Sequence, residues 1–346
     1  MLSQSLLVKA ARCEDVVRPP VWFMRQAGRY MKEYQAIRRN HTFPEMYKTP
    51  EIARDITLQP VHVIGVDAAI LFSDILVVPE AMGMTLEFVD GKGPMFPNPV
   101  RSAPDVKRLV SDGSADKLEF VYEAIKLVKK DLGDIPLIGF AGAPFTVASY
   151  MVEGGGTKSF KEIKKLLFKN PDLADRLLEK ITKVTIDYLN HQIKSGVDTI
   201  QIFDSWANAL AWNEFSRFSL KYIQKVIQGL DNPEHVPVIV FCKGSSVFAP
   251  LLENVGADVI SLDWNCDMRD MRDKIREDIA LQGNLDPMLL YAPVETIRKH
   301  VQTWLKGMEG QRGFIVNLGH GILPDIPVEA VKCVVDTVKE FETCRK

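Results

Sequence analysis

The segment MRQAGRY at residues 24–30 places two arginines four residues apart around a glycine. Residues 25–41 hold one acid, Glu33, against six basic or imidazole side chains: Arg25, Arg29, Lys32, Arg38, Arg39 and His41. Guanidinium groups bind carboxylates and phosphates through paired hydrogen bonds. A solvated basic loop is the common explanation of such a run. A strand-like apolar run leads directly into Arg25, however, and this favours a site for an anion that carries several carboxylates.

Asp74 ends the apolar run AAILFSD and is followed at once by ILVVP. A carboxylate in such surroundings is costly unless it finds a partner. It could cap a helix or pair with an arginine. The functional alternative is an acceptor for substrate N–H groups or for developing positive charge.

His320 lies between two glycines in NLGHG. Glycines allow close approach to a ligand, and an imidazole can bind a carboxylate or exchange protons near neutral pH. A loop histidine that caps the next helix is the alternative, but the glycine flanks favour a functional role.

Tyr150 and Ser205 are weaker candidates. Tyr150 precedes the EGGGT loop at residues 153–157, a flexible turn or lid, and a tyrosine in such an apolar segment is more often packed in the core. Ser205 in FDSWANA has no neighbouring histidine, so it is a hydrogen-bond donor rather than a nucleophile. The sequence has neither H-E-x-x-H nor paired His/Cys spacing, so we expect no metal and no other cofactor.

Eight short apolar runs end in small or polar residues, and helical patterns separate most of them. The runs span residues 20–28, 67–74, 135–142, 199–205, 236–244, 258–263, 279–286 and 313–321. Continuous apolar character is typical of strands covered on both faces. Strand–helix alternation predicts a parallel sheet, and eight units favour a closed (β/α)8 barrel over a doubly wound open sheet.

Helix signals support this arrangement. Thr49 with Pro50, and Asn170 with Pro171, mark two helix starts, and Gly196 ends the second helix. We expect an N-terminal extension at residues 1–18 and one barrel domain at 19–346, with a hairpin or long loop at 89–105. The polar residues at strand ends would then meet at the mouth of the barrel, where barrel enzymes place their active sites.

Composition excludes several classes of protein. Hydrophobic residues make up 46% of the 346, the net charge is −2, and no apolar stretch approaches the about 20 residues that span a bilayer. We therefore expect neither a nucleic-acid nor a membrane partner. Five scattered cysteines argue against a disulfide framework. No targeting segment is evident, so we expect a cytoplasmic protein, or a plastid one if a transit peptide is missing.

The motifs MRQAGRY, FSDIL, YMVEGGG, GNLDP and NLGHG, in this order, resemble the uroporphyrinogen decarboxylase family. The resemblance extends from Pro19 to the last helix. It implies a (β/α)8 barrel that works as a homodimer and a carboxy-lyase that needs no cofactor. The implied reaction converts the four acetate side chains of uroporphyrinogen III to methyl groups, giving coproporphyrinogen III and CO2 in tetrapyrrole biosynthesis.

The resemblance also implies site residues by matched position. The substrate-binding set would be Arg25, Gln26, Ala27, Arg29, Arg38, Asp74, Tyr150, Ser205 and His320. Asp74 would be catalytic and would stabilise a protonated pyrrole, the electron sink that the loss of CO2 requires. Arg25 and His320 are the two candidates for the proton donor. The chain departs from the family where Trp206 stands at the place of a frequent histidine, which puts polar contacts near Ser205 in doubt.

Two other functions compete with this one. A methyltransferase that acts with a corrinoid protein would use a His-x-Cys zinc site, but here Val240 stands where the histidine should be, two residues before Cys242. A tetrapyrrole carrier without activity would need the arginines but not Asp74.

Overall fold

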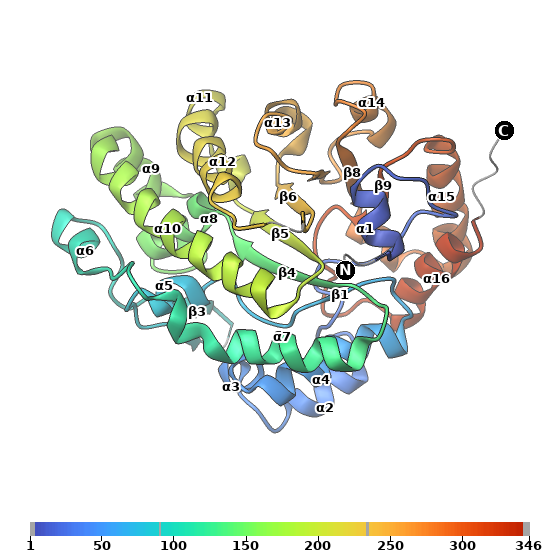
Figure 1. Ribbon diagram of the computed structural model, residues 1–346, viewed down its shortest axis with the longest axis horizontal. Coiled ribbons are helices and arrows are strands. Elements are labelled where there is room, and N and C mark those ends of the chain that lie inside the picture. Colours follow the sequence, from blue (N-terminus) through green and yellow to red (C-terminus); the bar gives the residue numbers. More distant parts are fainter. Residues whose placement is uncertain (1–3, 90, 233–234, 342–346) are drawn as a thin grey trace.

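The computed structural model describes residues 4–89, 91–232 and 235–341. Its centre is a curled sheet of seven parallel strands, and helices lie around the outside (Figure 1). In sheet order the strands are β1 (Ala69–Ile70), β4 (Leu137–Gly142), β5 (Thr199–Asp204), β6 (Val238–Cys242), β7 (Val259–Ser261), β8 (Ala280–Leu285) and β9 (Phe314–Leu318). Because each strand pairs with the next one along the chain, the sheet has the order of a TIM-like α/β fold.

The first predicted strand, at residues 20–28, joins the two edges of this sheet without being a regular strand. Val21 forms a parallel bridge with Val316 in β9, and its carbonyl accepts from Asp67 N (2.8 Å) just before β1. The Asp67 carboxylate in turn accepts from Val21 N (2.8 Å), and Arg18 fixes that carboxylate with two hydrogen bonds. The pairing with β9 is limited to this one bridge, so the segment is not a regular strand. The prediction of eight regular strands in the sheet is corrected to seven in the parallel sheet of the described residues.

The helices form two groups. Those that follow or precede strands on the outside are α4 (Pro50–Val63), α7 (Glu119–Leu132), α10 (Pro171–Ser195), α12 (Lys221–Gln228), α13 (Ser245–Leu252), α14 (Met268–Arg272), α15 (Val294–Gly307) and α16 (Val328–Lys339). The others are α1 (Leu6–Ala11), α2 (Lys32–Arg38), α3 (Phe43–Lys48), α5 (Val77–Ala81), α6 (Ala103–Arg108), α8 (Pro144–Glu153), α9 (Lys161–Lys169), α11 (Trp212–Phe215), the 3-10 helices η1 (Ala115–Leu118), η2 (Ala207–Ala209) and η4 (Pro287–Tyr291), and a π-helical turn η3 (Ser216–Leu220). None of the described helices is long and apolar enough to cross a membrane.

The predicted helix signals are confirmed. Pro50 is the first residue of α4 after Thr49, and the Asn170 side chain accepts from Leu173 N (3.2 Å) at the start of α10. Gly196 ends α10 in the left-handed conformation, which a glycine adopts at little cost. The cysteines at 13, 242, 266 and 333 are free thiols, and Cys344 lies outside the described residues.

The predicted hairpin is also present, as β2 (Glu87–Val89) paired with β3 (Gly93–Met95). It packs on the EGGGT loop: Met95 bridges to Gly155, and Phe96 N donates to Gly154 O (2.9 Å). On the other side of the loop, Glu153 Oε1 accepts from Glu162 N (2.8 Å) and Ile163 N (3.0 Å) in the first turn of α9. The loop predicted to be a flexible turn or lid is therefore held from two sides.

The inside of the sheet has its own apolar core, separate from the layer between strands and helices. It consists of Trp22, Met24, Ala68, Ile138, Ile239, Phe241, Val259, Ala280 and Ile315 together with Leu7, Ala10 and Ala11 from α1. These α1 side chains are buried, and the helix contacts β8 and β9. The polar strand ends described below lie at the other, C-terminal end.

A buried polar group sits within this interior. Trp22 Nε1 donates to Gln282 Oε1 (2.9 Å), and Gln282 Nε2 donates to Gln201 Oε1 (3.0 Å) and Ser261 Oγ (2.9 Å). All four residues are fully buried. A buried acceptor that loses its donor costs more than an ordinary hydrogen bond contributes.

We expect Trp22→Phe to lower the free energy of unfolding by at least about 1–3 kcal/mol, because it removes the N–H that donates to Gln282 together with part of a fully buried ring. Urea unfolding followed by circular dichroism measures the change. Trp212→Phe, at a half-exposed indole on α11, is the control. Equal stability of the two variants would contradict the role given to this hydrogen bond.

Candidate active site

The arginine turn, residues 24–30, has a strained backbone that the buried Gln26 side chain holds in place. Arg25 has φ +59°, a conformation that costs a non-glycine residue about 1–3 kcal/mol. The fully buried Gln26 beside it donates through Nε2 to Ala68 O (3.0 Å) and accepts at Oε1 from Phe23 N (3.1 Å). Its amide thus ties the turn to the segment before β1. The Gln26 side chain thus holds the turn in place, and its predicted substrate contact stays a prediction.

The Arg25 side chain lies across Gly321. A Cβ at Gly321 would be 2.6 Å from Arg25 Cγ and 3.0 Å from Nε, closer than real Cβ contacts. The last glycine of NLGHG therefore provides space for the arginine. Ile322 N donates to Met24 O (3.0 Å), which fixes the two segments against each other.

Asp74 lies between β1 and α5 and is partly buried. Its Oδ1 accepts from Leu76 N (2.7 Å) in a turn before α5, but the N-cap of that helix is Leu76, so Asp74 does not cap it. Burial raises the pKa of Asp74 to about 6, against the lowering effects of this N–H and of the nearby Arg25 charge. Arg25 is thus an electrostatic neighbour of Asp74, but the two form no ion pair within the described structure.

Tyr150 faces the same two charges. Burial raises its pKa to about 12, Asp74 adds to the rise, and Arg25 opposes it. The ring stacks on Trp206 with centroids 3.8 Å apart, and Phe160 meets Trp206 edge to face (5.1 Å). Trp206, the departure from the family pattern, therefore supports Tyr150 from behind by ring stacking.

His320 completes this group. Burial lowers its pKa to about 4, and the charges of Arg25 and Lys243 act in the same direction. Nδ1 accepts from Gly321 N (2.8 Å), which leaves the proton of the neutral imidazole on Nε2. At neutral pH His320 is therefore an uncharged ring with one N–H to donate.

Aromatic rings lie beneath these residues. Phe140, Phe203 and Phe241, from β4, β5 and β6, form a series of edge-to-face contacts, with centroids 5.7 and 6.1 Å apart. The series ends at His320, which meets Phe241 at 5.8 Å. An apolar floor below a group of charges suits a ligand with a flat apolar centre and a charged periphery.

Asp204 at the end of β5 is a buried acid that the sequence analysis did not assign. It accepts from Thr146 Oγ1 (2.6 Å) and from Ser219 Oγ. Burial raises its pKa to about 6, against the effect of these hydroxyls. Thr146 Oγ1 also accepts from Trp206 N (3.2 Å). Asp204 therefore positions α8 and the ring that supports Tyr150.

The other predicted residues lie around this centre. Burial raises the pKa of the Tyr34 hydroxyl, and the nearby charges of Arg38 and Arg29 oppose this rise. Arg38 also donates to His41 O (2.8 Å). Tyr34 meets Phe72, two residues before Asp74, edge to face (5.8 Å). Ala27 and Ser205 are partly buried. The structure thus brings Arg25, Asp74, Tyr150 and His320 together, with Arg29 and Arg38 in a neighbouring group.

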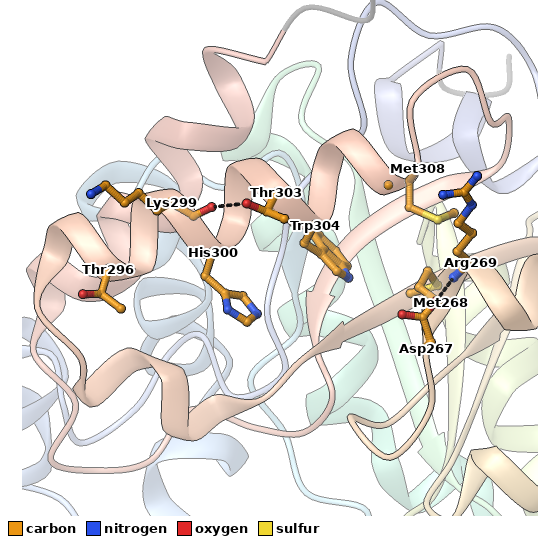
Figure 2. A pocket seen from close by; sticks show the side chains of 10 residues that line it. Asp267, Met268, Arg269, Thr296, Lys299, His300, Thr303, Trp304 and Met308 are labelled. Atoms are coloured by element: carbon orange, nitrogen blue, oxygen red, sulfur yellow. Dashed lines mark hydrogen bonds between the residues drawn. The ribbon is translucent and has the colours of Figure 1, made fainter.

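A separate groove of about 620 Å³ lies between α14 and α15. Figure 2 shows His300 and Trp304 of α15 facing Met268 and Arg269 of α14. No residue of this groove belongs to the group around Asp74. Among the described residues, no cluster of three or more His, Cys, Asp or Glu side chains could hold a metal ion.

The fold and these residues define a TIM-like α/β protein with a group of charged and polar side chains at the ends of its strands. The profile of the family described as uroporphyrinogen decarboxylase (URO-D) matches residues 2–341. Curated proteins named uroporphyrinogen decarboxylase from Protochlamydia amoebophila and Myxococcus xanthus are each 49% identical to this chain. The alignments cover 96% of the chain, and 91% and 95% of these relatives, respectively. The chain belongs to the uroporphyrinogen decarboxylase family.

Solved structures support the fold. A methyltransferase from Methanosarcina mazei superposes with a TM-score of 0.80 at 24% identity, covering 99% of both chains. A B12-independent methionine synthase from Shewanella sp. W3-18-1 gives 0.55 at 13% identity, with 94% of this chain and 98% of that one covered. In β6, Val240 and Cys242 belong to the core between strands and helices, whereas Phe241 belongs to the interior. Positions 240 and 242 therefore point away from the candidate site.

We expect Gly321→Ala to displace the Arg25 side chain and to raise KM about 10- to 100-fold. A change of this size corresponds to the loss of one hydrogen bond to a charged group. Gly307→Ala on α15 is the control, because its added methyl meets no atom within 4 Å. Steady-state kinetics of both variants provide the measurement. A KM that stays at the wild-type value in Gly321→Ala would show that Arg25 does not depend on this glycine.

We expect His320 to titrate with a midpoint near pH 4 and to carry its proton on Nε2. NMR of 15N-labelled histidine measures both quantities, with His320→Gln used to assign the signal. A midpoint near the ordinary value of about 6.5 would contradict this environment.

Proposed function

We propose that this carboxy-lyase converts the four acetate side chains of uroporphyrinogen III to methyl groups and releases coproporphyrinogen III and CO2. Family membership supports the reaction class. The structural observation that supports the proposal most is the environment of Asp74, a carboxylate with a raised pKa that interacts with Arg25 and Tyr150. A site that only binds anions would not need a carboxylate, because a carboxylate repels them.

The chemistry gives Asp74 its role. Each acetate keeps its two C–C electrons when CO2 leaves, and these electrons need a sink. Protonation of the pyrrole ring provides the sink: the C–C bond breaks, its electron pair neutralises the ring cation, and a second proton converts the exocyclic methylene to a methyl as the ring releases the first. In net terms one proton replaces one CO2. Asp74 accepts the pyrrole N–H groups and stabilises the cation as it forms.

Arg25 is the better of the two predicted proton donors. At a pKa of about 4, His320 holds almost no imidazolium at neutral pH. We assign it instead a hydrogen bond from Nε2 to a substrate carboxylate. Arg25 carries a charge that acts on Asp74, Tyr150 and His320 together. It therefore lies where the ring and its acetates would meet.

The remaining predicted residues bind the periphery of the substrate. Arg29 and Arg38 supply charge for carboxylates, Ser205 and Tyr150 supply hydroxyls, and Ala27 supplies its backbone within the arginine turn. The proposal requires no cofactor. The side chains of Arg25 and Arg29 have no hydrogen-bond or ion-pair partner within the described structure, so both are free to bind a polyanion.

We also propose a homodimer. Half-exposed apolar side chains follow β5 to β8 at the end of the sheet that holds the site: Trp212, Val247, Trp264, Met288 and Tyr291. Apolar groups gathered on one face are typical of protein–protein contacts.

The reaction is tested by anaerobic incubation with enzymatically generated uroporphyrinogen III, with EDTA present and no cofactor added. The products are then oxidised and separated by carboxyl number. We expect porphyrins with seven, six, five and four carboxyls. Unchanged eight-carboxyl material would overturn the proposal and favour a tetrapyrrole carrier.

We expect Asp74→Asn to bind uroporphyrinogen III but to lower kcat about 10²- to 10³-fold, the usual cost of losing one preorganised electrostatic contact. Asp131→Asn, on the outer helix α7, is the control. A kcat of Asp74→Asn equal to that of wild type would contradict the role proposed for Asp74.

The pH dependence follows from the same group. Asp74 must be ionised to accept N–H groups, so we expect kcat/KM to fall as the pH drops through about 6. The profile is measured between pH 5 and 8 for wild type and for Glu80→Gln. Glu80 raises the pKa of Asp74, so its neutralisation should move the acid limb to lower pH. A wild-type profile that stays flat from pH 8 down to pH 5 would contradict the assignment.

A further inference from the structure

Lys243 directly follows β6, at the same level as the polar strand ends of the candidate site. Side chains two residues apart on a strand point to the same face. Phe241 belongs to the interior core and contacts the His320 ring (5.8 Å). Lys243 continues this row by one step. Its backbone is fixed between two neighbours, because Lys243 N donates to Asp204 O (3.2 Å) and Gly244 N donates to Asp263 Oδ2 (2.6 Å).

The ammonium of Lys243 lies near His320, since its charge lowers the pKa of that imidazole. It has no hydrogen-bond or ion-pair partner in the part of the chain that the structure describes. The two buried acids whose residues bond to the backbone of Lys243 and Gly244 are already occupied: Asp204 accepts from two hydroxyls, and Asp263 accepts from Ser245 Oγ (2.9 Å) and from Gly244 N. The lysine therefore remains an uncompensated cation.

The position of β6 in the sheet makes this charge complementary to the arginine turn. Three strands separate β6 from residues 20–24 in either direction: β1, β4 and β5 on one side, and β9, β8 and β7 on the other. Lys243 and the arginine turn thus rise from opposite positions in the sheet. A macrocycle with carboxylates around its whole periphery needs cations on both sides.

We propose that Lys243 binds a carboxylate of the substrate, on the side of the site away from the arginine turn. This inference rests on the proposed function, because it takes a polycarboxylate macrocycle as the ligand. The lysine acts on binding and does not take part in the loss of CO2.

The test compares Lys243→Gln and Lys243→Arg with wild type in anaerobic steady-state kinetics with uroporphyrinogen III. Lys299→Gln, an exposed lysine of the groove between α14 and α15, is the matched control (Figure 2). We expect Lys243→Gln to raise KM about tenfold, with kcat within about twofold of wild type. Lys243→Arg should recover most of the affinity, and Lys299→Gln should match wild type.

Salt separates a charge contact from a structural role. KM of wild type should rise with NaCl, and the rise should be shallower in Lys243→Gln because one ionic contact is gone. If Lys243→Gln does not fold, the same measurements are made on Lys243→Met, which keeps the aliphatic part of the side chain and removes the charge. An unchanged KM, or equal losses in the Gln and Arg variants, would overturn the inference while an active wild type leaves the proposed function intact. An inactive wild type would instead overturn the proposed function.

Discussion

The site depends on cations that have no acidic partners. Arg25, Arg29 and Lys243 have no ion pair within the described residues, whereas Asp204 and Asp263, two acids at strand ends, are buried and occupied by hydroxyl and backbone donors. Unpaired like charges repel one another, so this arrangement costs stability until an anion binds. The fold tolerates the cost because the regular strands below carry the core and the charges lie only at the strand ends.

Asp74 is the exception that gives the site chemistry. Burial raises the pKa of Asp74 to about 6, so the carboxylate remains mostly ionised at neutral pH. No ion pair within the described residues compensates its charge. Such a carboxylate gains most when positive charge develops next to it. Tyr150 is held beside it by the ring of Trp206, which Thr146 and Asp204 fix in turn. The aromatic floor and the charged rim thus suit two different parts of one ligand.

Much of this was accessible from the sequence, because polar residues at the ends of parallel strands must meet. That rule brought together Arg25, Asp74 and His320, whereas Tyr150, a residue of α8, was predicted from the family resemblance. Applied to every run, it would also have singled out Lys243, which directly follows VFC in residues 236–244. The irregular first strand was not accessible, since the apolar run at residues 20–28 does not reveal that it pairs with β9 through a single bridge at Val21. The buried place of Gln26 and the hydroxyl partners of Asp204 likewise depend on contacts between distant segments.

A crystal structure with coproporphyrinogen III, grown under anaerobic conditions, tests the central claim most directly. We expect the macrocycle to lie on the phenylalanine floor, with its pyrrole N–H groups donating to Asp74. Its propionates should reach the arginine turn on one side and Lys243 on the other. A macrocycle bound in the groove between α14 and α15, or one that turns carboxylates rather than N–H groups toward Asp74, would contradict the account.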